Sequence, residues 1–443
     1  MAQAKTRVFS AFLALTCFGT TALALAGLWF FRPTSIGQFS VVVLVTYLLV
    51  WFPFALTEQI SPRKTPLRFL LCSLSILFVI ACLEGAAFGR VIDYRVLFGT
   101  FSDEPWRNPV NRLDPELLHV RKPNLAMKFT QRGGDISFYA DVPDPSPHEF
   151  DVQFDKDGFR NKKELAATDI IVVGDSFIES DITPYDHLMT TVLSRFTGKT
   201  VLNLGQLWYG PQQELVVLKR FGLVRKPKVC VWAFFEGNDL SDFRRYESVK
   251  KDWDRISARF DSARDRSFLV NAMQVAFKRL GKAPAKEPPN LGEVVIRGKS
   301  VGDLYFYYPG KPLDAQDLST LAKTSEIFRD ALYACKREEV DFIVAFVPSK
   351  FRVYHDLCKF PEGSKCLDWR PSDLNVRLAA LLREVSPEIG FIDLTDSLRN
   401  EAETGKLVYL RDDTHWSIEG NAAAAKGIAD FLENRSKTRK QTQ

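Results

Sequence analysis

The sequence predicts an α/β protein in which three transmembrane helices precede a parallel sheet. Two patterns carry this prediction. Three long apolar runs occupy roughly the first ninety residues, and short apolar runs alternate with helical patterns from about residue 169 onward. Strands that alternate with helices are typical of a parallel sheet with helices on both faces. We therefore expect a membrane anchor followed by an α/β domain.

The three apolar runs cover residues 8–31, 39–56 and 69–88. Each could cross a hydrocarbon core of about 30 Å as a helix that rises about 1.5 Å per residue. A cleaved signal peptide is the alternative for the first run, because Ala22-Leu23-Ala24 resembles a cleavage site. Two further runs follow it, which favours a retained span. Buried core helices are the alternative for the second and third runs.

The basic residues near the span ends predict the orientation of the anchor. They are Lys5 and Arg7 before the first span, Arg32 in the first loop, and Arg63, Lys64 and Arg68 in the second loop. This distribution places the amino terminus and the second loop in the cytoplasm, although Arg90 and Arg95 beyond the third span count against it. We therefore expect a multi-pass protein of the cytoplasmic (inner) membrane with an extracytoplasmic, periplasmic catalytic domain.

Composition excludes several classes of function. The net charge is +5, and acidic and basic residues are interspersed without a basic stripe, so we expect no nucleic-acid partner. No cysteine pair has metal-ligand spacing, so we expect no metal, and no motif calls for a cofactor. Cys358 and Cys366 flank a short loop, and a disulfide between them is an open possibility in an oxidising compartment.

The chain divides into three regions: an anchor (1–92), a connecting segment (93–168) rich in Pro, Asp and Arg, and a catalytic domain (169–435). The apolar runs of that domain predict strands at 170–173, 201–204, 229–235, 342–347 and 391–394. An insertion at about 248–311 interrupts the rhythm and ends in the aromatic run 305–308. It could be a lid over the site or a packed structural insert.

Ser176 and His415 are the residues that point most directly to chemistry. Ser176 follows Gly174-Asp175 at the end of a predicted strand, where open α/β sheets place their sites. A serine hydroxyl needs an adjacent base, and His415 has two carboxylates just upstream. In an extended segment Asp413 would face the ring, whereas in a helical turn Asp412 would. Because a helix begins only after His415, we expect an extended segment and choose Asp413.

Two further turns are suited to hold an oxyanion. Asn203-Leu204-Gly205 ends the second predicted strand, and Gly237-Asn238-Asp239 follows the third. The Asn238 amide and a backbone N–H near Gly205 could join the Ser176 N–H around a developing negative charge. Such donors stabilise the transition state of acyl transfer.

Four blocks together resemble the SGNH (GDSL-like) hydrolase superfamily over about residues 169–433. They are Gly174-Asp175-Ser176, Asn203-Leu204-Gly205, Gly237-Asn238-Asp239 and Asp413-Thr414-His415-Trp416. The resemblance implies a flavodoxin-like three-layer sandwich and ester chemistry without a metal. It also implies Ser176 as nucleophile, His415 as base, Asp413 as its orienting carboxylate and Asn238 as an oxyanion donor.

The blocks depart from the usual pattern in two places. The Asp413-Thr414-His415-Trp416 block is more similar to the alginate O-acetyltransferase branch than to the commoner Asp-x-x-His, although Asp412 preserves that option. In the second block Trp208 stands where a smaller residue is usual, which leaves Gly205, Trp208 and Gly210 as rival backbone donors.

The expected function is a membrane-anchored serine esterase of the cell envelope that hydrolyses an acyl ester through an acyl-enzyme on Ser176. One alternative is an O-acyltransferase that moves an acetyl group to an envelope carbohydrate, which the aromatic run 305–308 could bind by stacking. A second alternative is a non-catalytic binding or assembly module beside envelope-polymer machinery. In the first two cases the substrate would be an acyl ester or an acylated carbohydrate.

Overall fold

The computed structural model describes residues 65–442 except 101–103, 163, 259–262 and 281–289. The chain forms two compact units. One unit comprises Met1–Pro109 and Arg259–Ala283, and the other comprises Val110–Ala258 and Pro284–Gln443. The second unit contains the predicted sheet and all the residues predicted to form the site.

A five-stranded parallel sheet is the centre of the second unit. Its strand order is β12-β10-β7-β5-β6, with all neighbouring pairs parallel. The strands are β5 (Ile170–Gly174), β6 (Val201–Gly205), β7 (Val229–Phe235), β10 (Asp341–Val347) and β12 (Gly390–Asp393). Numbered along the chain, this order is 2-1-3-4-5, which is the flavodoxin-like arrangement. The parallel sheet is therefore present as the sequence predicts.

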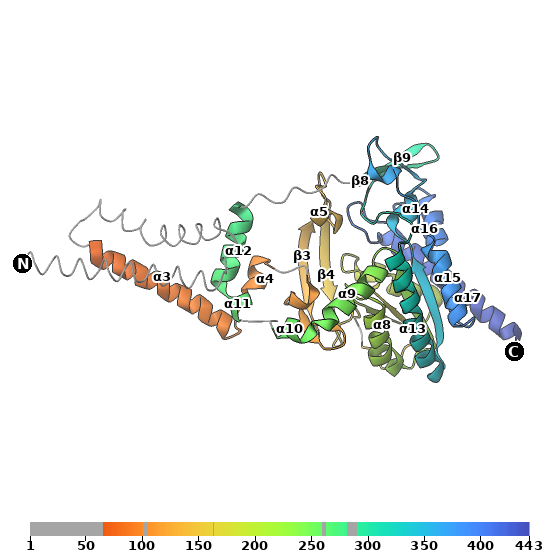
Figure 1. Ribbon diagram of the computed structural model, residues 1–443, viewed down its shortest axis with the longest axis horizontal. Coiled ribbons are helices and arrows are strands. Elements are labelled where there is room, and N and C mark those ends of the chain that lie inside the picture. Colours follow the sequence, from red (N-terminus) through yellow and green to blue (C-terminus); the bar gives the residue numbers. More distant parts are fainter. Residues whose placement is uncertain (1–64, 101–103, 163, 259–262, 281–289, 443) are drawn as a thin grey trace, which may run out of the picture. The chain divides into compact units, whose positions relative to one another are not determined.

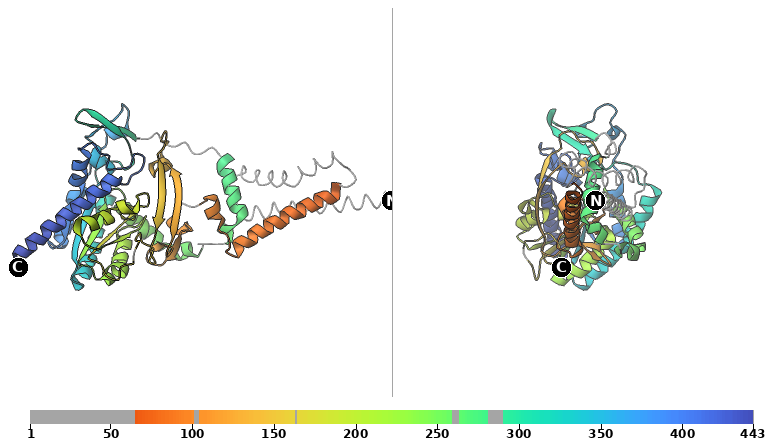
Figure 2. Two further views of the ribbon diagram at one scale, coloured as in Figure 1. Left: turned by 180° about the vertical axis from the view of Figure 1, so that it is seen from behind. Right: turned by 90° about the vertical axis from the view of Figure 1, so that its left-hand side faces the viewer.

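Helices cover both faces of the sheet, because alternate strand residues are apolar on each side. Ile170 and Val172 of β5 face one core, whereas Ile171 and Val173 face the other. The first core is closed by α7 (Met189–Thr197), α16 (Thr395–Ala402) and α17 (Ile418–Thr442). The second is closed by α8 (Pro211–Val217), α9 (Asp239–Lys251), α13 (Ala315–Arg337) and α15 (Leu374–Val385). In Figure 1 the side covered by α8, α13 and α15 faces the viewer. In the left view of Figure 2, which is seen from behind, α17 lies in front.

Smaller antiparallel sheets border the sandwich. The pairs are β1 (Asn111–Asp114) with β2 (Leu118–Arg121), β3 (Ala126–Arg132) with β4 (Pro147–Gln153), and the hairpin β8 (Asn290–Ile296) and β9 (Lys299–Phe306) with β11 (Cys358–Lys359). Short helical segments also occur along the chain. They are η1 (Pro105–Arg107), α5 (Ile136–Tyr139), α6 (Ser176–Glu179), η2 (Tyr185–His187), η3 (Leu218–Gly222), η4 (Leu223–Arg225), α10 (Trp253–Ser257), α14 (Lys350–Tyr354) and η5 (Lys365–Leu367). Cys358 and Cys366 are free thiols here, and burial raises the pKa of each.

The described part of the first unit is helical. It contains α3 (Thr65–Phe88), α4 (Tyr94–Phe98), α11 (Ala263–Arg266) and α12 (Phe268–Leu280). Tyr94 packs edge-on against Phe268, with ring centroids 5.2 Å apart. The insertion predicted at 248–311 is thus divided, since α11 and α12 belong to this unit and the β8–β9 hairpin belongs to the other.

The prediction of three transmembrane helices is wrong. The predicted spans 8–31 and 39–56 lie outside the described residues, and the span 69–88 falls within α3. In the part of the chain that the structure describes, no helix has both the length and the apolar character needed to cross a bilayer. The end of α3 is instead tied to its own unit, because Glu84 accepts hydrogen bonds from the Ser267 hydroxyl (2.9 Å) and the Leu269 N–H (2.8 Å). The multi-pass location in the cytoplasmic membrane is contradicted on the same ground.

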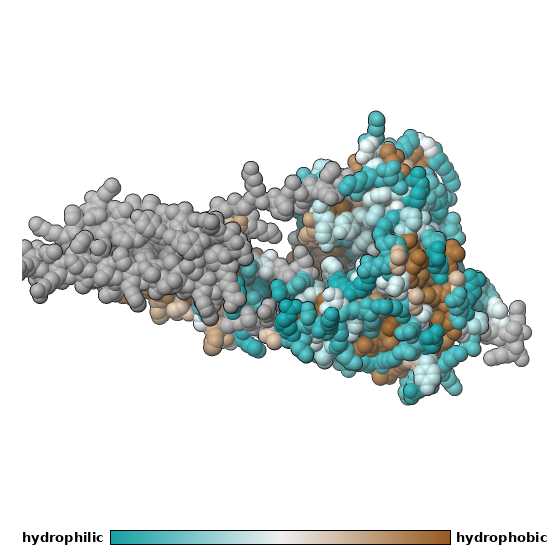
Figure 3. Space-filling view, in the orientation of Figure 1, coloured by the Kyte–Doolittle hydropathy of each residue, from teal (hydrophilic) through white to brown (hydrophobic). Residues whose placement is uncertain are grey.

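Aromatic packing between α13 and the sheet should dominate the stability of the second core. Phe328 is buried against Trp232 and Phe234, whereas Tyr333 on the same helix is 67% exposed. The described surface seen in Figure 3 is mainly hydrophilic, with some hydrophobic patches. Phe328→Ala should lower the free energy of unfolding by about 3–5 kcal/mol, because it leaves a cavity. Tyr333→Ala should change it by less than about 0.5 kcal/mol. The midpoints of urea unfolding test both, and equal shifts would contradict this account of the core.

Candidate active site

The carboxyl ends of β5, β6 and β7 bring three of the four motif blocks to one edge of the sheet. Ser176 begins α6 directly after β5, and Asp175 caps this helix by accepting a hydrogen bond from the Phe177 N–H (3.0 Å). The Ser176 side chain is nearly buried, with 9% of the residue exposed. Ser176 therefore sits on a tight strand-to-helix turn and is largely buried.

The loop before α17 carries the fourth block to the same edge. Tyr409 and Trp416 form an antiparallel bridge, and the Leu410 N–H donates to the His415 carbonyl (3.0 Å). Trp416 is buried and packs edge-on against Phe177 of α6, with centroids 4.9 Å apart. The segment before His415 is thus not helical but a tight turn closed by this bridge, with a turn at Arg411 and Asp412 and bends from Asp413 to His415. The extended backbone expected from the sequence is not present there.

His415 contacts both Ser176 and Asp413. Its Nε2 lies 2.7 Å from Ser176 Oγ, and its Nδ1 lies 2.7 Å from Asp413 Oδ1, which also accepts the His415 backbone N–H (2.9 Å). Burial alone would lower the pKa of His415, but the Asp413 carboxylate outweighs it and raises that pKa. Burial would likewise raise the pKa of Asp413, but the charge and hydrogen bond of His415 lower it.

Asp412 faces away from His415. Its carboxylate accepts hydrogen bonds from His148 Nε2 (3.0 Å) and from the Ser146 N–H (2.7 Å), and both side chains of the pair are buried. The structure therefore brings Asp413, and not Asp412, to the ring nitrogen. Asp412 holds a segment that precedes the sheet in the chain.

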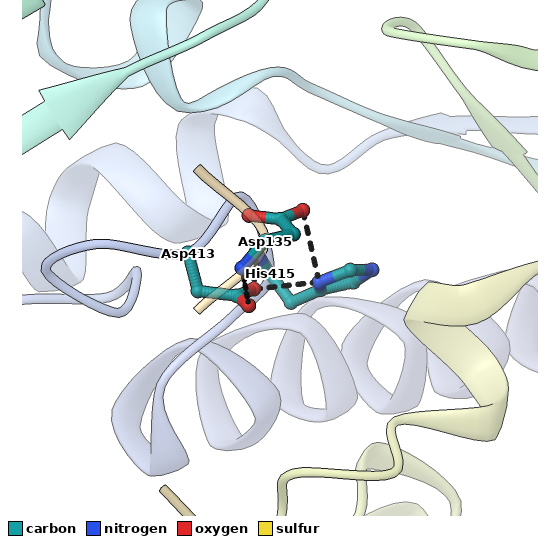
Figure 4. A group of neighbouring side chains, drawn as sticks. All are labelled: Asp135, Asp413 and His415. Carbon is teal, nitrogen blue, oxygen red and sulfur yellow. Dashed lines mark hydrogen bonds and ion pairs between the residues drawn. The ribbon is translucent and has the colours of Figure 1, made fainter. Parts of the chain in front are cut away.

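Asp135 is a second carboxylate beside His415 that the sequence motifs do not include. Its Oδ2 lies 3.8 Å from His415 Nδ1, its N–H donates to Asp413 Oδ2 (2.8 Å), and its carboxylate accepts from the Thr414 N–H (2.8 Å) and hydroxyl. Figure 4 shows Asp135 and Asp413 both directed at the same ring nitrogen of His415. Burial and the charge of Asp413 raise the pKa of Asp135 to about 6.

The predicted oxyanion donors have different surroundings. Asn238 begins α9, and its side-chain amide hydrogen-bonds the Asp175 carboxylate. The Gly205 N–H already donates to the side chain of Asn203 (2.9 Å), and a Cβ at Gly205 would overlap the backbone of α6. Glycine is therefore required there for close packing.

Gly210 and Trp208, the rival donors in the second block, are also fixed in position by contacts with other side chains. The Gly210 N–H donates to Gln213 Oε1 (3.2 Å), and Trp208 has a positive φ of 69°. The Arg245 guanidinium lies over the Trp208 ring, 4.7 Å from its centroid, and donates to its carbonyl. This arrangement stabilises a left-handed conformation that a non-glycine residue seldom adopts.

Buried charged side chains position the loops around the site. Glu179 of α6 pairs with Arg121 (2.6 Å) and accepts hydrogen bonds from the Gln206 side chain and the Leu207 N–H. Lys350 is buried beside the other loop, and its ammonium donates to the carbonyls of Tyr305 (2.9 Å) and Leu410 (2.6 Å). Burial lowers the pKa of Lys350 to about 8.

A metal ion is a chemical alternative at one position. Asp135, Asp413 and His415 each offer a ligand atom, and these atoms lie within 4.8 Å of one another. His415 Nδ1 and Asp413 Oδ1 already hydrogen-bond each other, so an ion would have to replace that bond.

The flavodoxin-like strand order and the contacts of His415 with Ser176 and Asp413 at the sheet edge agree with what the resemblance to the SGNH superfamily implies. Residues 305–443, which include Asp413 and His415, match the family model described as the SGNH hydrolase-like domain of acetyltransferase AlgX. The match confirms the resemblance to the SGNH superfamily and to the alginate O-acetyltransferase branch predicted from the motifs. The match covers residues 305–443, which is less than half of the chain, and it supports an SGNH-type hydrolase or acetyltransferase.

Similar solved structures include a lipolytic protein of the G-D-S-L family from Desulfitobacterium hafniense, a lipase/acylhydrolase from Enterococcus faecalis and the acetyl xylan esterase AlAXEase. Their identities are 13%, 14% and 11%, with TM-scores of 0.31, 0.30 and 0.30. The alignments cover 60% of this chain and 99%, 96% and 98% of those chains. These scores are too low to carry an argument, so the assignment rests on the family model. No curated protein matches the sequence.

Asp135, His148 and Lys350 are the site neighbours that sequence reasoning missed. Asp135 and His148 lie in the segment interpreted as a connection, where weak periodicity gives no structural cue. The pair Gly133-Gly134 was the available signal, because a Cβ at Gly134 would lie 2.6 Å from the Asp412 carbonyl. Consecutive glycines of this kind can mark a close approach of two backbones.

The His148–Asp412 pair should make stability depend on pH. Burial would lower the pKa of His148, but the hydrogen bond and charge of Asp412 raise it. The stabilisation should be complete below the unfolded value of about 6.5 and should be lost as the pH rises through the higher folded value. His148→Gln should therefore lower Tm more at pH 6 than at pH 9. The exposed His187→Gln is the control, and a pH-independent loss for His148→Gln would refute the charged pair.

Proposed function

We propose that this protein is a serine esterase that cleaves an acyl ester through an acyl-enzyme on Ser176. The observation that supports this most directly is the pair of 2.7 Å contacts that His415 makes with Ser176 and Asp413. A base within about 2.6–3.2 Å of the hydroxyl, itself oriented by a third group, is the arrangement that activates a serine.

In the proposed mechanism Ser176 Oγ attacks the ester carbonyl while its proton moves to His415 Nε2. Asp413 holds Nδ1–H and stabilises the imidazolium that forms. Collapse of the tetrahedral intermediate breaks the ester C–O bond, and His415 returns the proton to the departing alcohol oxygen. Water then attacks the acyl-serine with His415 as base, which releases the carboxylic acid and restores Ser176.

The oxyanion would be held by the Ser176 N–H and the Asn238 amide, with Gly205 as a third candidate. The Gly205 N–H donates to Asn203, so it would have to exchange that partner for the oxyanion. Losing one oxyanion donor typically costs about 3 kcal/mol of transition-state stabilisation. On this proposal, Asn238 is the side chain whose removal should reduce turnover most among the donors.

A second candidate function is an O-acyltransferase, in which a carbohydrate hydroxyl replaces water. The family match to an acetyltransferase favours it, and so does a row of aromatic rings beside the site. Tyr139 stacks on Tyr307 (centroids 4.8 Å apart), and both rings are partly exposed. Tyr308 links this pair to Phe235, which packs against α6.

A pocket of about 220 Å³ adjoins the same edge and could receive the acceptor. Its lining includes Gly237, Ser241, Arg244 and Tyr308, and so combines an aromatic face with hydrogen-bonding groups. Sugars present both apolar faces and hydroxyls, which such a lining would bind. In this reading the donor is an acetyl ester and the acceptor is a carbohydrate.

The proposed triad should behave as one unit. Ser176→Ala and His415→Ala should each lower kcat by orders of magnitude, and the double variant should be little worse than either one. Asp413→Asn should cost about 10⁴-fold because it favours the wrong tautomer of His415. Asp412→Asn should be mild because Asp412 bonds His148 instead. Hydrolysis of 4-nitrophenyl acetate by the full chain measures all four, and substantial turnover by folded Ser176→Ala would refute the proposed function.

The aromatic row separates the two candidates. With an acetyl donor and a neutral or an anionic oligosaccharide, free acetate and acetylated sugar are measured separately. If the protein is a transferase, Tyr307→Ala should reduce acetylated sugar several-fold while free acetate is kept or increased, because water replaces the lost acceptor. Tyr333→Ala, at an exposed position on α13, is the matched control. Free acetate alone, in equal amounts with and without sugar, would favour the esterase.

A further inference from the structure

We propose that Asp135 is a positioning residue which acts together with Asp413 on His415, so that two carboxylates face Nδ1 of the imidazolium when it forms. This inference rests on the proposed function. It goes beyond the family motifs, because Asp135 lies in the segment between β3 and β4 and outside all four blocks.

Asp135 helps to hold the loop before α17 that carries His415, which we call the catalytic loop. Its N–H holds the Asp413 oxygen that does not contact His415, while its carboxylate accepts two hydrogen bonds from Thr414. Asp135 therefore bonds to both residues that directly precede His415. Its Oδ2 remains 3.8 Å from Nδ1, which is close enough for charge attraction but too long for a hydrogen bond.

The segment that carries Asp135 is fastened to the same loop at its other end. We call residues 133–148 the clasp. His148 and the Ser146 N–H bind Asp412, and Arg411 donates to the Asp144 carbonyl (3.0 Å). Gly134 has no side chain to keep the clasp away from Asp413. With both ends attached, the clasp holds the Asp135 carboxylate at a fixed distance from the ring.

The charged and titratable groups around Asp135 come from several elements. They are Asp413 and His415 on the catalytic loop, His148 on β4, Lys350 on α14 and Tyr308 after β9. The Asp135 side chain is 31% exposed, so its own charge is only partly screened by water. Burial and the like charge of Asp413 make its ionisation unfavourable, while the charge of His415 opposes them.

The charge of Asp135 should therefore have opposite effects on stability and on turnover, which a purely structural residue would not show. Because the Asp135 N–H bonds the Asp413 carboxylate and so keeps the two carboxylates close together, the negative charge of Asp135 should cost stability in the fold. The same charge should stabilise the imidazolium during turnover. An opposite charge within about 4–6 Å raises a histidine pKa by about one unit or more. Asp135 should therefore improve turnover at some cost in stability.

Asp135→Asn tests the charge alone, because asparagine keeps an oxygen for Thr414 and the backbone N–H for Asp413. We expect the plateau of kcat/KM for 4-nitrophenyl acetate to fall about tenfold. The acid limb of the pH profile should move down by about one pH unit, because His415 loses one of two carboxylates. At pH 8, Tm should be unchanged or higher. Asp144→Asn removes an exposed charge from the same clasp and should alter neither quantity.

Two further variants separate the carboxylate from the backbone donor. Asp135→Ala removes the carboxylate and keeps the N–H, whereas Asp135→Pro removes both at a backbone φ of −60° that proline accepts. Proline should therefore lose more activity than alanine. The rate at which a fluorophosphonate labels Ser176, measured against pH, gives a second readout that counts only folded protein.

The outcomes distinguish this inference from the proposed function. An unchanged plateau and acid limb in Asp135→Asn, with Ser176→Ala inactive, would overturn the role of Asp135 alone. A loss of activity that only follows a lower Tm would overturn it as well, because it would reduce Asp135 to a structural residue. Full activity of Ser176→Ala would overturn the proposed function itself.

Discussion

The site depends on burying three consecutive polar residues, Asp412, Asp413 and Thr414, beside the sheet edge. All three are at least nine-tenths buried, and an unpaired buried carboxylate is very unfavourable. Each therefore has a partner of its own: Asp412 has His148, Asp413 has His415, and Thr414 has Asp135. Two of these partners come from the clasp. The segment before the sheet is thus needed to make the loop that carries His415 compatible with burial.

Parallel strand register supplies the other half of the arrangement. β5 and β7 are parallel and paired so that Val173 lies opposite Trp232, and the turns that follow both strands lie at the same edge of the sheet. Ser176 and Asn238 become neighbours for this reason, although 62 positions separate them in the printed sequence. The loop with His415 then only has to reach this edge. It does so through its bridge between Tyr409 and Trp416 and through the packing of Trp416 on Phe177.

The sequence alone could locate the sheet and the residues at its edge, because each block directly follows an apolar run or precedes a long helix. The choice of Asp413 over Asp412 agrees with the contact at the ring, but its reason does not, because residues 411–415 form a turn and bends rather than an extended strand. The sequence could not locate Asp135 or His148. The bond from Asp135 to Asp413 spans 278 residues, and no local pattern encodes a pairing of that length. A related reason applies to the apolar run at 69–88, which was interpreted as a membrane span. The hydrogen-bond partners of Glu84, Ser267 and Leu269, lie 183 and 185 residues further along the chain, so no local pattern indicates them.

Several carboxylates gather behind Ser176, but their surroundings decide which of them carry charge. Burial raises the pKa of Asp175, Glu214 and Asp239, and it raises that of Asp242 to about 7. None of these four has a histidine as a direct hydrogen-bond partner among the described contacts. Asp413 does, and its pKa is lowered instead. Burial thus disfavours the charged form of these four acids, whereas the contact with His415 favours the charged form of Asp413 beside the ring that must become positive. Burial would be costly for a lone carboxylate. Because Asp413 is buried in contact with His415, its negative charge acts mainly on that ring.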